Sequence, residues 1–155
     1  MKLFGWGKAK ESPPPDSAYA RGMESVEQGR WGERAAEKFL RRKGWRVLGR
    51  NVRPCPRDLR CEIDLIFRTR EGGVVFVEVK THKAHTDWAP RLAGVDKRKK
   101  DVLLRACANW LMRNRWHGDF RFDVVEVWGD RSAAAAPEID HVEDVRLFNA
   151  NWRFW

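Results

Sequence analysis

Residues 61–80 read CEIDLIFRTREGGVVFVEVK, and this stretch decides the fold of the chain. It predicts two strands, residues 61–67 and 74–80, joined by a tight turn at residues 70–73. The second strand is almost entirely apolar, which is typical of a strand in a sheet interior that is covered on both faces. The alternative is a surface hairpin whose charged side chains face water, which is where alternating charges usually lie.

Two carboxylates meet across this predicted hairpin. If the hairpin is centred on Glu71, it sets Ile66 opposite Phe76 and Asp64 opposite Glu78. Like charges that face each other across a ladder are destabilising, and burial forces one carboxyl group to take up a proton. A divalent cation removes the conflict, because Mg²⁺ prefers oxygen ligands such as carboxylates. The same register sets residue 62 opposite residue 80, and residues 78 and 80 share one face of the strand.

The flanking sequence predicts helices and further strands in an α/β order. Gly44 is placed to cap the first helix, and a strand–helix–strand unit makes the strand after the second helix parallel to the strand at 74–80. Asp123 on that later strand is expected to have a structural role. The predicted elements are a helix at 23–43, a strand at 45–52, a helix at 95–114, a strand at 121–128 and an edge strand at 138–142.

Four consecutive cations begin the second predicted helix, where positive charge opposes the helix macrodipole. Phosphate binding accounts for them better than a solvated basic face does, because helix N-termini and lysines both attract phosphate oxygens. We therefore expect Lys97 and Lys99 to bind nucleic acid. The loop at 81–94 adjoins the hairpin and adds Lys83 and Arg91 as expected substrate contacts.

The overall charge and the cysteines limit the class of protein. A net charge of +9 and an isoelectric point near 9.9 favour an anionic partner, with nucleic acid ahead of an acidic membrane; a solvated basic surface is the alternative. Three cysteines without a C-x-x-C pair indicate reduced thiols in the cytoplasm and argue against structural zinc. No apolar stretch is long enough to span a membrane.

One domain is expected from a chain of 155 residues. We expect a flexible Pro-rich extension at 1–22, the domain itself at 23–148 and an aromatic tail at 149–155. The tail carries Trp152, Phe154 and Trp155, for which packing against the domain or a second subunit is favoured over base stacking.

The ordered motifs resemble a known superfamily of nucleases. EIDLI at 62–66 and FVEVK at 76–80 resemble the D…E-x-K core of the PD-(D/E)-x-K superfamily. The set of motifs from residue 29 to residue 127 resembles the uncharacterised bacterial YraN-like family, which is similar in layout to archaeal Holliday junction resolvases. Two positions depart from the family: Cys61 stands where a glycine is usual, and His82 stands where a basic residue is usual.

The resemblance implies a restriction-endonuclease-like fold, a mixed β-sheet flanked by helices. It implies that Asp64 and Glu78 bind Mg²⁺ or Mn²⁺ and that Lys80 orients the attacking water and stabilises the developing charge. Glu33, otherwise an ordinary exposed helix residue, becomes a third catalytic carboxylate and metal ligand.

The implied activity is a metal-dependent DNA endonuclease, with DNA ahead of RNA, branched or structured DNA as substrate, and a homodimer as the cutting form. Two other functions stay open: a non-catalytic nucleic-acid-binding module of the same fold, and an assembly factor that contacts another protein through the aromatic tail.

Overall fold

The computed structural model describes residues 18–83 and 97–147. The predicted elements are confirmed there, although α1 begins at Ala18, so residues 18–22 belong to a helix and not to the expected extension. Residues 1–17, most of the loop after the hairpin and the aromatic tail lie outside the described residues. The elements are α1 (Ala18–Arg42), β1 (Arg46–Val52), β2 (Ile63–Arg68), β3 (Val74–His82), α2 (Lys97–Arg113), β4 (Phe120–Trp128) and β5 (Glu138–Val142).

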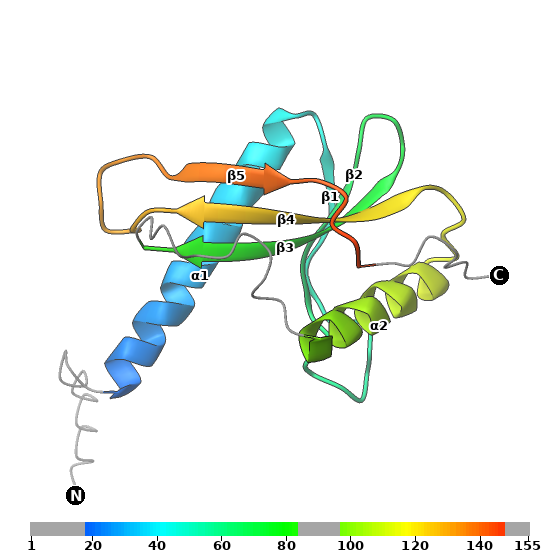
Figure 1. Ribbon diagram of the computed structural model, residues 1–155, viewed down its shortest axis with the longest axis horizontal. Coiled ribbons are helices and arrows are strands. Elements are labelled where there is room, and N and C mark those ends of the chain that lie inside the picture. Colours follow the sequence, from blue (N-terminus) through cyan, green and yellow to red (C-terminus); the bar gives the residue numbers. More distant parts are fainter. Residues whose placement is uncertain (1–17, 84–96, 148–155) are drawn as a thin grey trace, which may run out of the picture.

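The five strands form one mixed sheet in the order β1-β2-β3-β4-β5 (Figure 1). Neighbouring strands are antiparallel except β3 and β4, which are parallel, as the strand–helix–strand pattern predicts. In Figure 1, α1 passes behind β3, β4 and β5. The fold is therefore the predicted α/β architecture of a mixed sheet flanked by helices.

Both faces of the sheet are covered, because β3 buries side chains on each of them. Val75 and Val77 pack against Leu40 of α1 in one core, whereas Phe76 packs with Leu103 of α2 in the other. This alternation follows from the period of two along a strand. The apolar run of β3 is thus interior, and the alternative of a surface hairpin is wrong.

The hairpin has the predicted register where its ladder is formed. Ile66 pairs with Phe76, and the ladder runs from the Arg68–Val74 pair to the Leu65–Val77 pair. Beyond that pair, the Asp64 side chain of β2, and not a backbone carbonyl, accepts the hydrogen bond from the Val79 N–H. The expected approach of residue 62 to residue 80 is not observed: Glu62 forms its ion pair with Arg53.

The end of α1 confirms the predicted glycine cap. Gly44 has φ 82°, a conformation that glycine adopts without strain, and its N–H donates to the carbonyl of Arg41 at 2.9 Å. Neither helix of the described residues combines the length and the apolar character that crossing a membrane requires.

Candidate active site at the diverging ends of β2 and β3

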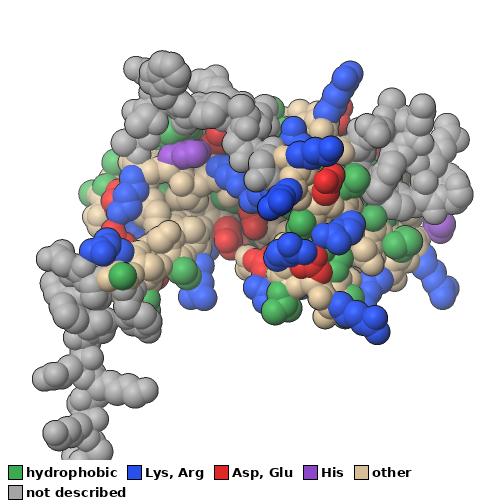
Figure 2. All heavy atoms as spheres, turned by 60° about the horizontal axis from the view of Figure 1, so that its bottom comes forward, with side chains coloured by type: hydrophobic (Ala, Val, Ile, Leu, Met, Phe, Trp, Pro, Cys, Tyr) green, Lys and Arg blue, Asp and Glu red, His purple; other side chains and the backbone are tan. Residues whose placement is uncertain are grey.

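Asp64 and Glu78 lie side by side where the β2–β3 ladder ends. The Val79 N–H donates to Oδ2 of Asp64 at 2.8 Å, so a carboxylate takes the place of the next strand partner. Glu78 is 4% exposed on the middle strand of the sheet. Figure 2 brings the lower side of Figure 1 forward and shows acidic side chains in a recess, with Lys and Arg side chains around them.

The environment of Asp64 opposes its ionisation. Burial, and next the negative charge of Glu78, raise the pKa of Asp64 to about 7, and the charge of Glu33 adds to the rise. The Val79 N–H and the charge of Lys99 act in the other direction. Without a bound cation, Asp64 is therefore close to half protonated at neutral pH.

Glu78 is neutralised by two lysines from different elements. Lys80 Nζ donates to Glu78 Oε1 at 2.8 Å along β3, and Lys99 of α2 donates to the same oxygen. Burial lowers the pKa of Lys99, but the charge and hydrogen bond of Glu78, with smaller contributions from Lys80 and Asp64, raise this pKa overall. The charges that neutralise Glu78 thus come from β3 and from the start of α2.

Lys99 therefore has a different position from the one that the sequence predicts. It was expected to reach phosphates from a basic helix start, but in this structure it lies on Glu78, part-buried. Its spacing to Leu103 and Ala106, both buried in the α2 core, puts all three on the inward face of the helix. That spacing is the signal that could have assigned Lys99 to the site.

The other predicted nucleic-acid contacts are spread more widely. Lys97 is exposed at the first residue of α2. Lys83 is exposed and bound to Glu24 of α1 at 2.5 Å, with Asp130 at 3.8 Å. Arg91 lies outside the described residues. Of the four, only Lys99 contacts the carboxylate pair within the described part of the chain.

Glu33 reaches the site because α1 passes very close to β3. A Cβ on Gly32 would lie 1.9 Å from Oγ1 of Thr81, so only glycine permits this approach. Asn51, the penultimate residue of β1, has φ 45° and donates to Oε2 of Glu33 at 3.1 Å. A groove of about 520 Å³ between α1 and the end of β3 is lined by both Glu33 and Lys80.

The carboxylates suit one divalent cation held by two residues. Asp64 and Glu78 supply hard oxygen ligands, and a bound cation would offset the burial and the charge of Glu78 that raise the pKa of Asp64. Residues 18–83 and 97–147 contain no group of three His, Cys, Asp or Glu side chains with metal-site geometry. Glu33 as a metal ligand, directly or through water, therefore stays a prediction.

The contacts of Asp123 and His82 are with residues outside the candidate site. Asp123 is fully buried and accepts hydrogen bonds from Arg121, His141 and the Asp144 N–H, which confirms its expected structural role. His82, predicted in a loop, instead ends β3 and stacks on Trp128 at 4.1 Å.

Comparison with known proteins identifies the family. The model of the "Uncharacterised protein family UPF0102" matches residues 32–127. A UPF0102 protein of Trichlorobacter lovleyi is 34% identical over 112 residues, covering 72% of this chain and 83% of the relative. Another from Rhodopirellula baltica is 39% identical over 129 residues, covering 82% and 73%. A third from Moorella thermoacetica is 40% identical over 110 residues, covering 70% and 87%.

Among solved structures, SfsA of Pyrococcus furiosus in complex with Ca²⁺ is similar with a TM-score of 0.35 and 13% identity, covering 77% of this chain and 63% of that one. A likeness of that size carries no argument about this chain. The family match spans Glu33, Asp64, Glu78, Lys80 and Lys99 and confirms the YraN-like resemblance. The chain is therefore a member of the UPF0102 family.

Proposed function

We propose that this protein is a metal-dependent phosphodiesterase that hydrolyses DNA at the Asp64–Glu78 centre. The observation that carries the proposal is the acidic pair itself, in which partly buried Asp64 lies beside buried Glu78 and its pKa is raised to about 7. A fold that needed only to bind nucleic acid has no use for a partly buried Asp64 beside a buried Glu78, because the ionised form of Asp64 is destabilising there. A carboxyl group with a perturbed pKa is typical of a functional site, and Val79, whose N–H donates to Asp64, lines the groove of Glu33 and Lys80.

Each residue has a role that its contacts support. Asp64 and Glu78 would hold Mg²⁺ or Mn²⁺ through carboxylate oxygens, and the carbonyl of Val79 is a third oxygen on the same strand. The ion would supply activation of the attacking water and neutralisation of phosphate charge. Lys80, in the groove with Glu33, would orient that water and bind the phosphate oxygen that gains charge in the transition state.

Lys99 would act as a counter-charge that changes partners. Glu78 Oε1 accepts from both Lys80 and Lys99 when no cation is present. A divalent ion on the same carboxylate repels both ammonium groups, so its binding would release at least one of them toward an incoming phosphate. This exchange reconciles the expected phosphate-binding role of Lys99 with its position on Glu78.

The substrate class rests on charge and on the resemblance. A chain with net charge +9 attracts phosphodiesters, and the similarity to junction resolvases favours branched or structured DNA cut by a homodimer. The free thiols of the three cysteines support a cytoplasmic location.

The second candidate function is a non-catalytic nucleic-acid-binding module. One observation favours it: Lys80 and Lys99 already neutralise Glu78, so the fold has partners for that carboxylate without any metal. The two functions differ in their need for a cation, because binding to phosphates does not require one.

A cleavage assay separates the two. Purified protein is incubated with Mn²⁺ or Mg²⁺ and linear, flapped or four-way DNA, beside Asp64→Asn and the matched control Asp119→Asn. Asp119 is an exposed aspartate before β4. If the protein is an enzyme, the unsubstituted protein and Asp119→Asn should cleave DNA only when the cation is present. Asp64→Asn should not cleave it under either condition. Binding of every DNA without cleavage by the unsubstituted protein would favour the binding module.

A further inference from the structure

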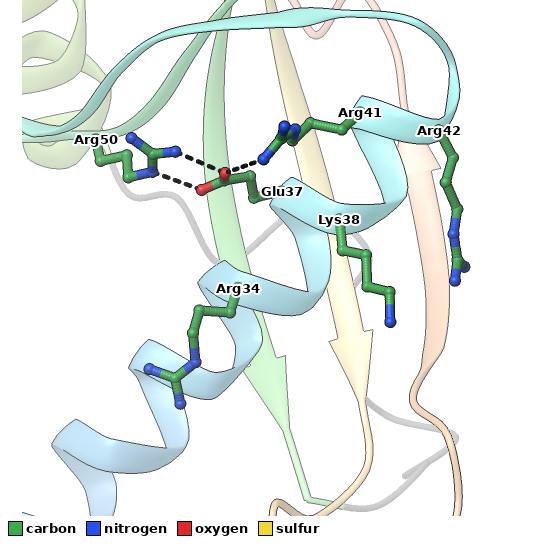
Figure 3. A pocket seen from close by; sticks show the side chains of 6 residues that line it. All are labelled: Arg34, Glu37, Lys38, Arg41, Arg42 and Arg50. Carbon is green, nitrogen blue, oxygen red and sulfur yellow. Dashed lines mark hydrogen bonds and ion pairs between the residues drawn. The ribbon is translucent and has the colours of Figure 1, made fainter.

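The outer face of α1 carries a basic groove that the candidate active site does not use. Its volume is about 710 Å³, and five cations and a single carboxylate line it. Figure 3 shows that most of these side chains come from α1 and one from β1. The lining residues are Arg34, Glu37, Lys38, Arg41, Arg42 and Arg50.

Three of these cations form a ridge along the helix. Arg34, Lys38 and Arg42 are exposed at successive spacings of four residues, so they lie one above another on the solvent face. None of the three forms an ion pair or hydrogen bond with the described residues. Like charges at this spacing destabilise a helix, and no contact within the described fold offsets the repulsion.

The carboxylate in the groove organises the remaining two cations. Arg50 of β1 donates to Glu37 through Nε and Nη2 at 2.7 and 2.8 Å, and Arg41 approaches the same carboxylate at 3.6 Å (Figure 3). The hydrogen bonds from Arg50 lower the pKa of Glu37. Glu37 thereby fixes a guanidinium on the groove wall, while the ridge on the other side stays unneutralised.

The groove is joined to the active site through β1. Arg50 precedes Asn51, the residue that holds Glu33, and Glu37 follows Glu33 by one helical turn. A ligand that leaves the groove of Glu33 and Lys80 can therefore pass directly onto the Arg50 side of α1.

We propose that Arg34, Lys38 and Arg42, with the Glu37-held Arg50, bind the phosphate backbone of a DNA strand that extends from the Asp64–Glu78 centre. This deepens the proposed function and rests on it for the identity of the DNA. From Arg34 to Arg42 the helix rises roughly 12 Å, and one strand of B-DNA carries a phosphate about every 3.4 Å. The ridge is thus long enough to contact about three phosphates.

An anionic membrane is the competing occupant. On the other side of the ridge lies an apolar groove of about 340 Å³, lined in part by Trp31, Phe39 and Ile139. A basic ridge beside aromatic groups also fits lipid headgroups. We favour DNA because Arg50 adjoins Asn51, which binds Glu33 of the candidate site, whereas the residues of the candidate site do not line the apolar groove.

The test measures DNA binding in EDTA, where no cleavage interferes. Affinity for a duplex longer than the groove is followed against KCl concentration for the unsubstituted protein and for the triple variant Arg34→Gln, Lys38→Gln, Arg42→Gln. Each lost phosphate contact lowers the slope of log affinity against log salt by about 0.9, so the triple variant should lose about two to three units. Its Tm without DNA should stay the same or rise, because the ridge repulsion is gone.

A matched triple variant controls for net charge. Arg113→Gln, Arg115→Gln, Arg146→Gln removes the same charge from exposed positions away from α1 and should change the slope by less than about one unit. An equal loss in both triple variants, or an unchanged slope in the ridge variant, would overturn the proposal. The proposal would also be overturned if the ridge variant lost binding to vesicles of anionic lipid but still bound DNA.

The outcome is separable from that of the proposed function. A ridge-dependent slope in a protein that cleaves no DNA with Mn²⁺ would support the ridge and defeat the phosphodiesterase. Cleavage that persists with an unchanged slope would defeat the ridge alone, and absence of any DNA binding would defeat both.

Discussion

Replacing Asp64 by asparagine should make the metal-free protein more stable above pH 7, although the residue is central to the proposed site. The pKa of Asp64 is raised from 3.8 to about 7, chiefly by burial and by Glu78. Each pKa unit corresponds to about 1.36 kcal/mol, so full ionisation of Asp64 destabilises the fold by up to about 4 kcal/mol. Asparagine lacks the charge and retains an oxygen that can accept from the Val79 N–H.

The sign follows from the direction of the shift. The folded state holds the Asp64 proton more tightly than the unfolded state does. The stability that this carboxyl group contributes is therefore fully present below about pH 4 and is lost as pH rises through about 7. The Asp64→Asn variant has no such group, so its stability does not fall in this pH range. At pH 8 the variant should therefore be more stable by about 2–4 kcal/mol, whereas at pH 4 the two proteins should differ by less than about 1 kcal/mol.

Urea unfolding in EDTA at pH 4, 6, 7 and 8 measures this difference. Asp119→Asn is the matched control, since it makes the same change at an exposed position and should show no such pH dependence. Mn²⁺ at about 1,000 times its Kd should cancel or reverse this difference at pH 8, because it stabilises the unsubstituted protein by about 4 kcal/mol. If Asp64→Asn were destabilised at pH 8 in EDTA, Asp64 would be a structural partner of a cation, and the electrostatic reasoning would fail.

Three further changes test the site. Glu78→Gln should lower metal-free stability by about 1–2 kcal/mol in urea unfolding, because it removes the anionic partner of part-buried Lys99; an increase would show that the lysines do not stabilise the carboxylate. Lys80→Met should retain Mn²⁺ binding by calorimetry but reduce the cleavage rate by about 10²-fold or more, and equal cleavage by both proteins would point to a contaminating nuclease. Gly32→Ala should reduce the free energy of unfolding by about 1–3 kcal/mol through collision with Thr81. The Gly32→Ala, Thr81→Ala double variant should regain part of that loss, and independent, additive effects would contradict the contact.

The hairpin could be predicted from sequence because its determinants are local. The turn with two glycines suggests a hairpin centred on Glu71, and Ile66 pairs with Phe76 as that centre requires. The same register placed Asp64 near Glu78. The end of the ladder could not be foreseen, because it depends on a side chain, Asp64, that replaces backbone as the acceptor of the Val79 N–H.

The contributions of the helices to the site were harder to predict. Lys99 was expected at the protein surface, because the run of four cations by itself does not show which one turns inward. Its spacing to the buried Leu103 and Ala106 does show this, but its contact with Glu78 also depends on how α2 packs against the sheet. The link from Asn51 to Glu33 depends in the same way on how closely α1 approaches β1. Such packing between elements distant in sequence leaves no pattern with a fixed period.

The strands lie in the sheet in the order in which the chain is synthesised. Each antiparallel pair can therefore form between consecutive segments, with little loop-closure entropy, and only the parallel β3–β4 pair must wait for an intervening helix. Hydrogen exchange during refolding should show early protection of the β2–β3 hairpin, with β4 and β5 added later. The acidic pair would then be brought together, and its repulsion felt, before Lys99 of α2 arrives to neutralise it. The rate at which this site assembles should therefore depend on pH, because repulsion within the pair requires Asp64 to be ionised.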